Sequence, residues 1–438
     1  MTAIQPPPRL KSLSPRRSAT ISVLDVGTSK VVCLVARLVP ASPSETLRGR
    51  THQVRVLGIG HQRARGLKGG AVIDMDEAET AIRQAVDAAE RMAGVQVEGV
   101  IVNMTGGRLA AQSFHAATSV TGHAVAESDL QRVLEAATSY SNEPGRVVLH
   151  SLPSGFALDN ASDIRDPRGM IGEKLAADLN VVTTDSTGLR NLLLAIERCH
   201  LSVEAVVATP YAAGLSVLVD DEAELGTALV DMGAGTTSIG VFRHGRLIHV
   251  DAVAVGGNHV TLDVARGLNT RIVHAERLKT LCGSTIMAPS DERESIDVVH
   301  VGDEDGEPTH LPRALLTRII TPRVEEILEL VRDRLKNAGL ADQAGRRLVL
   351  VGGAAQLTGL VDTARRILSP QVRLGRPLGV LGLPESARSP AFAAALGLAI
   401  YPQVAGIEHF EARRSGPMSA TGTDGYVARV GRWLKESF

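Results

Sequence analysis

The sequence has few cysteines, almost no net charge and no long apolar run. Its cysteines, Cys33, Cys199 and Cys282, lie far apart and form no CxxC pair, which argues against a zinc site or a disulfide framework and fits a reducing cytoplasm. The formal net charge is −1, so no overall field attracts the chain to nucleic acid, and we expect no nucleic-acid partner. A run of about eighteen apolar residues is also lacking, so we expect no membrane-spanning helix.

The remaining composition is that of a soluble globular protein, with 22% charged and 44% hydrophobic residues. A length of 438 residues predicts about two to four compact units. Residues 1–19 combine prolines with basic residues, and no apolar run follows them directly. We therefore predict a disordered basic tail there and not a signal peptide.

Strand and helix patterns alternate along both halves of the chain. Residues 21–37 predict strands interrupted at 25–30, and 77–92 have the apolar spacing of a helix, with Asp76 as its N-cap. Residues 105–179 are polar and predict a loop-rich inserted domain with one helix near 128–137. In the second half we predict a helix at 323–337, and also a buried strand at 348–351 and a buried helix at 391–400. The fold class expected from this alternation is α/β.

A short pattern occurs once in each half of the chain. Residues 23–27 and 229–233 are apolar strands that end in Asp-x-Gly, and small residues, hydroxyl residues and a second apolar strand follow each of them. Taken singly, such a pattern is also typical of an ordinary hairpin turn. Two copies at corresponding places predict two hairpins that face each other and hold a nucleoside triphosphate, because glycine turns and hydroxyl groups offer donors to phosphate. The two carboxylates suit Mg²⁺ bound through water, and a third element, a strand ending in Gly352-Gly353, lets a flat ring lie close to the backbone.

These three elements resemble the actin, Hsp70 and sugar-kinase superfamily. Residues 24–31 resemble its phosphate-1 motif, 229–242 its phosphate-2 motif and 348–360 its adenosine motif, and 209–214 and 389–401 resemble its connecting helices. The resemblance implies a duplicated fold of two lobes with ATP and Mg²⁺ between them. The residues assigned to the nucleotide are Asp25, Gly27, Thr28, Ser29, Lys30, Asp231, Gly233, Gly235, Thr236, Thr237, Gly256, Gly257, Glu276, Lys279, Gly352, Gly353 and Ala354, with Asp25 and Asp231 also holding the metal through water.

Within the superfamily the chain resembles the FtsA family, through residues 69–74, residues 322–330 and the place of the inserted segment. The domains implied are subdomain 1A at 20–104 and 180–213, an inserted subdomain 1C at 105–179, subdomain 2A at 214–262 and 336–402, subdomain 2B at 263–335, a flexible linker at 403–424 and a terminal helix at 425–438. The function implied is a cell-division scaffold that polymerises on the cytoplasmic face of the inner membrane. It tethers the FtsZ ring by the FtsZ C-terminal tail and recruits later division proteins through subdomain 1C. Arg313, Arg318 and Arg323 are candidates for the FtsZ contact, although they also fit ordinary surface charge.

Catalysis is expected to be weak or undetectable. Some filament-forming relatives carry a Glu just before the proline of the first connecting helix, where this chain has Thr209. Without a group that positions the attacking water, hydrolysis loses a large factor. No residue is assigned a firm catalytic role; Asp231 is a candidate, but its first task would be the metal.

The last fourteen residues predict an amphipathic helix. Its apolar face comprises Val427, Val430, Trp433, Leu434 and Phe438, and its basic residues are Arg429, Arg432 and Lys435. A helix of this kind lies in a membrane interface, where cationic side chains favour anionic lipid. The resemblance supports this interpretation, because FtsA proteins end in a membrane-targeting helix. The alternative is a helix docked on the protein's own core or in a partner's groove.

Three other functions belong to the same superfamily. A small-molecule kinase would need a catalytic carboxylate facing its acceptor, and the sequence offers no clear candidate beside Thr209. A pilus-assembly actin-like protein usually lacks the terminal helix. An Hsp70-type chaperone would need a peptide-binding domain after about residue 400, where only 38 residues remain.

Overall fold

The computed structural model describes residues 8–10, 13–42, 47, 49–105, 108–120, 122–138, 143–302, 307–341 and 347–409. The predicted helix at 425–438, its membrane-contacting residues and most of the predicted linker lie outside these described residues. The same holds for the first seven residues of the predicted basic tail.

Lobe 1 is built on a mixed sheet in the order β11-β6-β1-β2-β3-β19. Its strands are β1 (Ala19–Val26), β2 (Lys30–Pro40), β3 (His52–Arg63), β6 (Gly99–Met104), β11 (Ser202–Ala208) and β19 (Val380–Leu381). The first three form an antiparallel meander, whereas β6 runs parallel to β1 and β11 parallel to β6. Val31 to Ala36 of β2 are completely buried, which explains why this strand is a continuous apolar run.

Lobe 2 repeats this arrangement in the order β14-β13-β12-β17-β18. Its strands are β12 (Thr227–Met232), β13 (Thr237–Arg243), β14 (Arg246–Val253), β17 (Arg347–Val351) and β18 (Gln371–Leu374). Again an antiparallel meander is followed by two parallel additions. The duplicated two-lobed α/β plan expected from the sequence is therefore confirmed.

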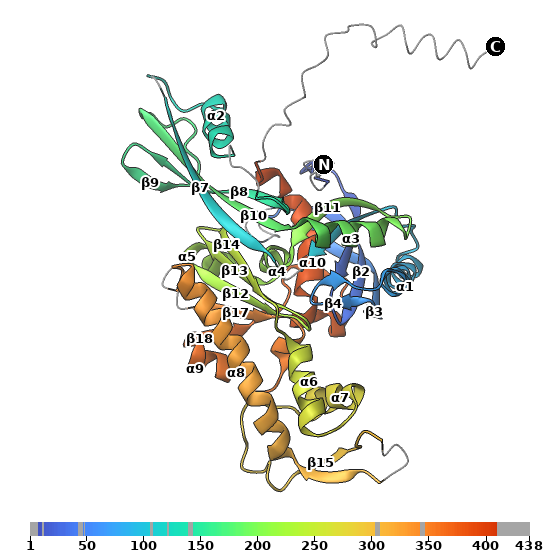
Figure 1. The fold of residues 1–438 in the computed structure, drawn as a ribbon. Helices are drawn as coiled ribbons and strands as arrows, with labels where there is room; N and C mark the ends of the chain where they lie inside the picture. Colours follow the sequence, from blue (N-terminus) through green and yellow to red (C-terminus); the bar gives the residue numbers. More distant parts are fainter. Residues whose placement is uncertain are drawn as a thin grey trace, which may run out of the picture.

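Helices cover the outer faces of the sheets and connect the lobes (Figure 1). In lobe 1 they are α1 (Met75–Ala93) and α3 (Ser186–Glu197), beside the short hairpin β4 (Leu67–Lys68)–β5 (Ala71–Val72). Lobe 2 carries α5 (Asp220–Leu225), α6 (Gly257–Gly267), α7 (Ile272–Cys282), α8 (Arg313–Asn337) and α9 (Leu360–Ile367), with the hairpin β15 (Ser295–Val298)–β16 (Thr309–Pro312). Between the lobes lie α4 (Thr209–Val217) and α10 (Ala393–Ile400). A Cβ on Gly397 of α10 would lie 1.7 Å from the Ala212 carbonyl oxygen of α4, so the two connecting helices touch through their backbones.

The inserted domain is a β-sheet with one face covered by α2 (Glu127–Ala137). Its strands β7 (Ala110–Ser119), β8 (Arg146–Leu158), β9 (Ala161–Ile164) and β10 (Lys174–Asp185) pair in the order β7-β10-β8-β9. The prediction of an inserted domain is confirmed, but the prediction that it is loop-rich is wrong. The sequence signal was weak because β7 has one exposed face of small and polar residues. Its structure comes from a long ladder with the distant strand β10, which runs from the pair Ala110–Thr183 to the pair Ser119–Lys174.

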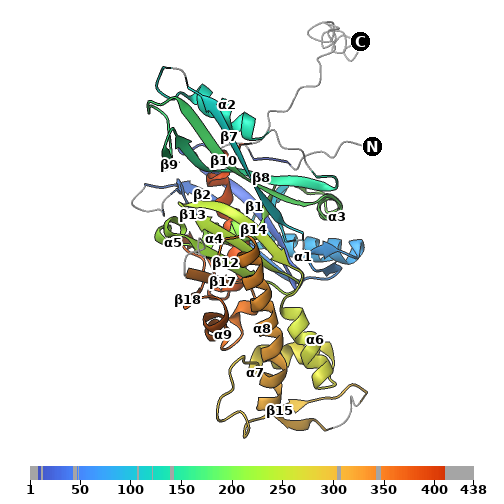
Figure 2. The same cartoon turned by 60° about the vertical axis from the view of Figure 1, so that its left-hand side comes forward.

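The inserted domain also contacts lobe 2. The buried Asn180 side chain of β10 donates from Nδ2 to the Leu247 carbonyl of β14 at 3.0 Å, and Arg165 pairs with Glu224 of α5 at 2.6 Å. Figure 2 shows this domain and the β15 hairpin at opposite ends of an elongated molecule. The insertion therefore bridges the two lobes and does not simply project from lobe 1.

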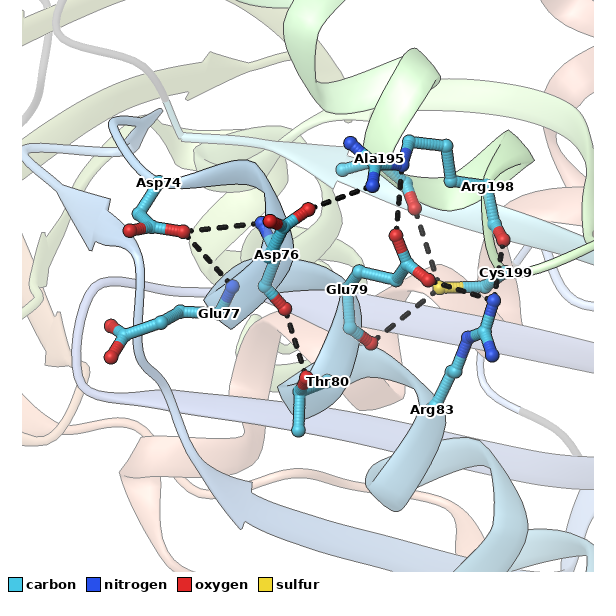
Figure 3. Close-up of polar contacts among 9 residues, drawn as sticks. All are labelled: Asp74, Asp76, Glu77, Glu79, Thr80, Arg83, Ala195, Arg198 and Cys199. Atoms are coloured by element: carbon cyan, nitrogen blue, oxygen red, sulfur yellow. Dashed lines mark hydrogen bonds and ion pairs between the residues drawn. The ribbon is translucent and has the colours of Figure 1, made fainter.

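The N-cap of α1 is Asp74 and not Asp76 as predicted. The Asp74 carboxylate accepts hydrogen bonds from the backbone amides of Asp76 at 3.1 Å and Glu77 at 3.0 Å (Figure 3). Asp76 lies inside the first turn and pairs with Arg198, which also contacts Glu79 at 2.8 Å. The extended backbone at Asp74 places the cap at the end of the β4–β5 hairpin, a tertiary feature that the local spacing does not contain.

Two further boundaries differ from the predictions. Helix α8 begins at Arg313, ten residues before the predicted start, and continues through Pro322. The Thr321 hydroxyl donates to the carbonyl oxygens of Thr317 and Thr285 beside this proline. Residues 403–409, predicted as the start of a flexible linker, pack on lobe 1 and the inserted domain, since the Gln403 side chain accepts from the amides of Thr51 and His52.

The main apolar core runs from the lobe 1 sheet through α4 and α10 to the inner face of the lobe 2 sheet. Separate clusters fill the rest of lobe 2 and the inserted domain. Among the described residues, no helix has the length and apolar character needed to span a membrane.

Candidate functional site

A cavity of about 420 Å³ lies between the lobes and is lined by both β-hairpin turns, α4, α6, α7, α8 and the segment that leads into α10. This volume lies in the range of small-molecule sites in proteins. The cavity takes its residues from positions that lie more than 300 apart in the sequence, such as Asp25 and Gly353. It is therefore created by the packing of the lobes and not by any single segment.

The two hairpin turns have the same backbone geometry. The Gly27 amide donates to the Lys30 carbonyl at 2.9 Å, and the Gly233 amide donates to the Thr236 carbonyl at 3.0 Å. A Cβ on Gly27 would lie 3.1 Å from the Lys30 carbonyl oxygen, and a Cβ on Gly233 would lie 3.0 Å from the Thr236 carbonyl oxygen. Both distances are tighter than an ordinary Cβ contact. Glycine at these two positions lets the chain turn tightly at the wall of the cavity.

Helix α6 holds the second turn in place. The amides of Gly257 and Asn258, at the start of the helix, donate to the carbonyls of Gly233 and Ala234 at 2.9 Å and 2.8 Å. Across the cleft, the Gly70 amide of the β4–β5 hairpin donates to the Thr28 hydroxyl at 3.1 Å. A Cβ on Gly235 would lie 3.0 Å from the Gly69 backbone, so the two lobes approach closely at this end.

Charged groups meet between the turns. Asp25 is 6% exposed and Asp231 is partly buried. Burial raises the pKa of both carboxyls, that of Asp231 to about 7 with the nearby charge of Asp25 as a further cause. The Lys30 ammonium donates to the Ala391 carbonyl and lies 4.5 Å from the centroid of the Phe392 ring. Burial lowers the pKa of Lys30, while the charges of Asp25 and Asp231 oppose that shift. A phosphate group would pair with the Lys30 ammonium, and a divalent cation would pair with the two carboxylates.

Asn103 anchors the first turn. Its amide nitrogen donates to the Asp25 carboxylate at 2.6 Å and to the Thr105 hydroxyl at 2.8 Å, and its amide oxygen accepts from the Val26 amide at 2.7 Å. This side chain is 1% exposed. The first turn is thus cross-linked to the neighbouring strand β6, which leads into the inserted domain.

The hydroxyls of Thr105 and Thr209 lie 2.8 Å apart, and Thr209 donates to the Met104 carbonyl at 3.1 Å. The Thr209 proton is therefore used internally, and Thr105 donates to Thr209. Neither hydroxyl is a base at neutral pH. The arrangement offers acceptor lone pairs to a water molecule but no group that would remove its proton.

The opposite end of the cavity has an open floor made by Gly352, Gly353 and Ala354. Gly352 has φ +90°, and a Cβ there would lie 2.4 Å from the Asp231 carboxylate, whereas a Cβ on Gly353 would meet nothing within 4 Å. Apolar side chains of Val324, Ile327, Leu357 and Leu360 line this end. Lys279 pairs with Glu276 at 2.6 Å and donates to the Thr261 hydroxyl at 2.9 Å. Such a floor and wall fit a flat heterocycle joined to a sugar.

The structure places most of the predicted nucleotide residues around the cavity between the lobes. The residues that line the cavity are Asp25, Gly27, Thr28, Ser29, Lys30, Asp231, Gly233, Gly235, Thr236, Gly257, Glu276, Lys279, Gly352, Gly353 and Ala354. Thr237 and Gly256 do not line it. The Thr237 hydroxyl donates to the Val255 carbonyl behind the wall, and a Cβ on Gly256 would meet the carbonyls of the second turn.

Other lining residues were not predicted. Thr105, and Asn103 behind the lining, could have been found, because a polar residue at the end of a buried strand is the same signal that identified Asp25 and Asp231. Val324, Ile327 and Pro390 gave no such signal, since their apolar character equally fits the core.

The carboxylates alone do not make a metal site. Within the described ranges, no group of three His, Cys, Asp or Glu side chains could hold a metal ion. Asp25 and Asp231 nevertheless fit Mg²⁺ bound together with a polyphosphate, because Mg²⁺ keeps several waters and typically takes one or two carboxylates beside the phosphates.

The three arginines proposed for a partner are engaged within the chain. Arg313 pairs with Glu294 at 2.8 Å, and Arg323 pairs with Asp263 at 2.5 Å. Arg318 has a longer pair with Glu292 at 3.7 Å, and its side chain is 64% exposed. Arg318 is therefore the most accessible of the three.

Comparison with known families gives two matches. Residues 228–397 match the model of "Cell division protein FtsA", and residues 106–183 match "SHS2 domain inserted in FTSA". The second match covers the strands and helix of the inserted domain.

Comparison with individual proteins agrees with the family models. The chain is 54% identical over 433 residues to a cell division protein FtsA of Agrobacterium fabrum, covering 98% of each chain. It is 31% identical over 423 residues to the FtsA of Escherichia coli K12, covering 95% of this chain and 97% of that one. Among solved structures it resembles a chain of the PilM-PilN type IV pilus biogenesis complex with a TM-score of 0.61 and 15% identity, covering 88% of this chain and 99% of that one. This last likeness supports the actin-like fold alone.

Proposed function

The chain belongs to the FtsA family of cell division proteins, and from that premise we propose that it binds ATP with Mg²⁺ between its lobes and acts as a membrane-attached, self-associating scaffold of the division ring. The observation that carries the nucleotide proposal is the convergence of Asp25, Lys30 and Asp231 from two equivalent turns on one cavity. Burying these charges together is unfavourable unless a ligand of complementary charge completes the set.

Each side of the cavity has a distinct task in this proposal. Lys30 and the turns at Gly27 and Gly233 would contact the phosphates, and Asp25 and Asp231 would hold Mg²⁺ through water. Lys279 and Glu276 would lie beside the ribose, and Gly353 would allow the adenine ring to approach the backbone. When bound, Mg²⁺ neutralises phosphate charge, and the protein groups fix the position of the triphosphate.

Hydrolysis would be slow. Thr209 is 3% exposed and its hydroxyl proton points to the Met104 carbonyl, so it cannot act as a base. Asp231 could accept a proton, but its carboxylate would be occupied by the metal hydration shell. We therefore propose that ATP acts mainly as a structural ligand that fixes the relative orientation of the lobes.

The scaffold role combines several surfaces. Head-to-tail contacts between copies would give an open filament, and the basic amphipathic helix at 425–438 would place it on anionic lipid of the cytoplasmic face of the inner membrane. Subdomain 2B, with Arg318 most accessible, would bind the C-terminal tail of FtsZ, and the inserted domain would recruit later division proteins. Several weak anchors in one filament would bind the membrane far better than one, because each acts at high effective concentration.

Nucleotide binding can be tested with a fluorescent ATP analogue titrated in the presence of Mg²⁺. We expect saturable binding that ATP displaces and that removal of Mg²⁺ weakens. Gly235→Ala should weaken it at least about fivefold, because its Cβ would press on Thr28 and Gly69 across the cleft. The matched control is Gly155→Ala, whose Cβ would have only an ordinary contact at 3.7 Å. A wild-type chain that shows no binding at millimolar analogue would contradict the proposal.

Membrane attachment can be tested through Trp433, the only tryptophan of the chain. Its fluorescence should shift to the blue when vesicles of anionic lipid are added, and less so with neutral lipid or at high salt. Leu434→Asp should abolish the shift. An unchanged spectrum of the wild-type chain at saturating anionic lipid would mean that this helix docks on protein instead.

A further inference from the structure

The last described residues are fixed by a buried carboxylate. The Glu408 side chain is 2% exposed, and its Oε1 accepts hydrogen bonds from Nδ1 of His150 at 2.9 Å and from the Tyr401 hydroxyl at 2.8 Å. The next residue, His409, donates from its backbone amide to the Ser151 carbonyl at 2.8 Å. The chain is thus held on strand β8 of the inserted domain just before it continues to residue 410.

His150 links this carboxylate to the wall of the nucleotide cavity. The Ala208 amide donates to Nε2 of His150 at 2.9 Å. Because Nε2 accepts, the proton of a neutral ring is on Nδ1, which is the nitrogen that faces Glu408. The ring is 0% exposed and lies edge-on to Tyr211, with 5.1 Å between ring centroids. Its orientation is therefore determined on every side.

Ala208 is the residue before α4, and its neighbour Thr209 lines the cavity beside Thr105. One peptide bond and two hydrogen bonds consequently separate the cavity wall from Glu408. The path runs from Thr209 through Ala208 and His150 to the carboxylate that anchors the chain before residue 410.

The anchor is an unusual choice for a purely structural junction. The second carboxylate oxygen of Glu408 is buried and has no hydrogen-bond partner among the described residues. A buried acceptor without a partner is unfavourable, and apolar packing would hold a chain segment at least as well. Hydrogen bonds weaken steeply when their geometry is lost, so a polar junction of this kind responds when its partners move.

We propose that the Ala208–His150–Glu408 connection couples the nucleotide cavity to the chain that follows residue 409, which includes the predicted membrane helix; this rests on the proposed nucleotide binding. A nucleotide that fixes Thr209 restrains Ala208 and so stabilises the hydrogen bonds of His150 and Glu408. Residues 401–409 are then held on β8. By reciprocity, a chain held at Glu408 favours nucleotide binding by the same factor.

The structure offers a matched control on the same segment. Gln403 also fixes residues 401–409, because its Oε1 accepts from the amides of Thr51 and His52, each at 3.0 Å. These contacts lead to the start of β3 and not to the cavity. Gln403→Ala should therefore speed amide exchange in residues 401–409 but keep its dependence on nucleotide. Glu408→Ala should speed the exchange and also remove that dependence. Glu408→Gln keeps an acceptor for His150 and should retain the coupling.

The test combines two measurements on the full chain. Hydrogen–deuterium exchange of residues 401–409 is measured with and without ATP and Mg²⁺, and the affinity for a fluorescent ATP analogue is measured in each variant. In the wild-type chain we expect nucleotide to slow exchange of these amides by about fivefold or more. In Glu408→Ala we expect fast exchange whose rate does not change when nucleotide is added. The Kd for the analogue should rise by about the factor by which nucleotide slows exchange in the wild-type chain. Gln403→Ala should keep the wild-type Kd.

The outcomes separate this inference from the proposed function. Analogue binding with no change of exchange at 401–409 in the wild-type chain would overturn the coupling, even if Glu408→Ala did not fold. An unchanged Kd in a folded Glu408→Ala variant would overturn it as well. Failure of the wild-type chain to bind any analogue would instead refute the nucleotide site.

Discussion

The two β-hairpin turns share a backbone and differ in chemistry. The strand registers pair Asp25 with Val32 and Asp231 with Ser238 at equivalent places, and the turn hydrogen bonds match within 0.1 Å (2.9 Å and 3.0 Å). Lobe 1 carries Lys30 where lobe 2 carries Thr236. The duplication thus preserved the geometry that points two carboxylates into the cleft, while only the turn of lobe 1 carries a lysine.

The strands next to these turns differ in the same way. In lobe 1, Asn103 near the end of β6 donates to Asp25 of the turn and to Thr105, the first residue after the strand, where the chain leads into the inserted domain. In lobe 2, the register places Val351 opposite Asp231, and Gly352 and Gly353 follow. Near the cavity, lobe 1 is therefore polar and cross-linked by hydrogen bonds, and lobe 2 is open. The two copies in a duplicated fold can thus divide two tasks, with one lobe binding charge and the other leaving space for a flat ring.

Removal of the lysine of the first turn should have the largest effect on the affinity for ATP. Lys30→Met keeps the length of the side chain and eliminates the charge, so we expect the affinity for ATP to fall about 10- to 100-fold. Isothermal titration calorimetry with Mg²⁺ present measures this loss. Lys174→Met, on an exposed strand end, serves as the control. An unchanged affinity in Lys30→Met would show that the lysine of the first turn does not distinguish the two turns in ATP binding.

Giving lobe 2 the residue of lobe 1 should close its open floor. Gly353→Thr copies Thr105, and we expect normal folding because the position has φ −65° and a Cβ would meet nothing within 4 Å. The affinity for ATP should nevertheless fall at least about tenfold, since the side chain occupies the space of the ring. Equal affinities of wild type and Gly353→Thr would show that the ring binds elsewhere.

Gly352→Ala is the contrasting substitution at the neighbouring position. Its φ of +90° and the close Asp231 carboxylate should make it destabilising. Thermal unfolding would therefore separate Gly352→Ala, a defect of folding, from Gly353→Thr, a defect of binding.

Asn103→Ala should destabilise lobe 1. It removes two hydrogen bonds donated to Asp25 and Thr105 and leaves the buried Val26 amide without its acceptor. We expect the free energy of unfolding to fall by about 2–4 kcal/mol, as measured by urea denaturation. The exposed amide of Gln112, which pairs with Glu143, provides the control substitution Gln112→Ala, expected to cost less than about 0.5 kcal/mol.

Asp231→Asn should have the smallest effect, and of opposite sign. The carboxylate is partly buried near Asp25, so a neutral amide should raise the free energy of unfolding by about 1 kcal/mol when no nucleotide is added. With ATP and Mg²⁺ present, the wild-type chain should regain the advantage because the variant holds the metal poorly. Asp25→Asn is the informative partner: its carboxylate accepts from Asn103, so the same change should destabilise lobe 1. Equal changes in the free energy of unfolding of the two variants would contradict the different roles of the two carboxylates.

The sequence predicted the parts of the fold and site that are encoded locally. Asp25 and Asp231 end buried apolar strands, and each is followed by a glycine, so a charged residue in an apolar context was visible without the structure. The repeat of that pattern predicted two equivalent lobes. Asn103 carries a similar signal near the end of β6, but the second residue after it is Thr105 and not the glycine that follows Asp25 and Asp231 at that spacing.

Features that depend on distant partners could not be predicted in this way. Strand β7 owes its structure to β10, and Asp74 caps α1 only because the β4–β5 hairpin delivers it there. Gly256 and Thr237 were assigned to the nucleotide, yet they face the supporting carbonyls and not the cavity. A sequence pattern identifies a turn, whereas packing decides which of its residues face the ligand.

The contact between Gly397 and Ala212 has a mechanical consequence. No methyl group fits between α4 and α10 at this point, and the main apolar core continues across it. We expect the lobes to change their relative angle at this crossing more readily than their separation. An occupant of the cavity would then act on that angle. In a chain of identical molecules joined end to end, small equal angles add up, and the occupant of the cavity would set the curvature of the whole assembly.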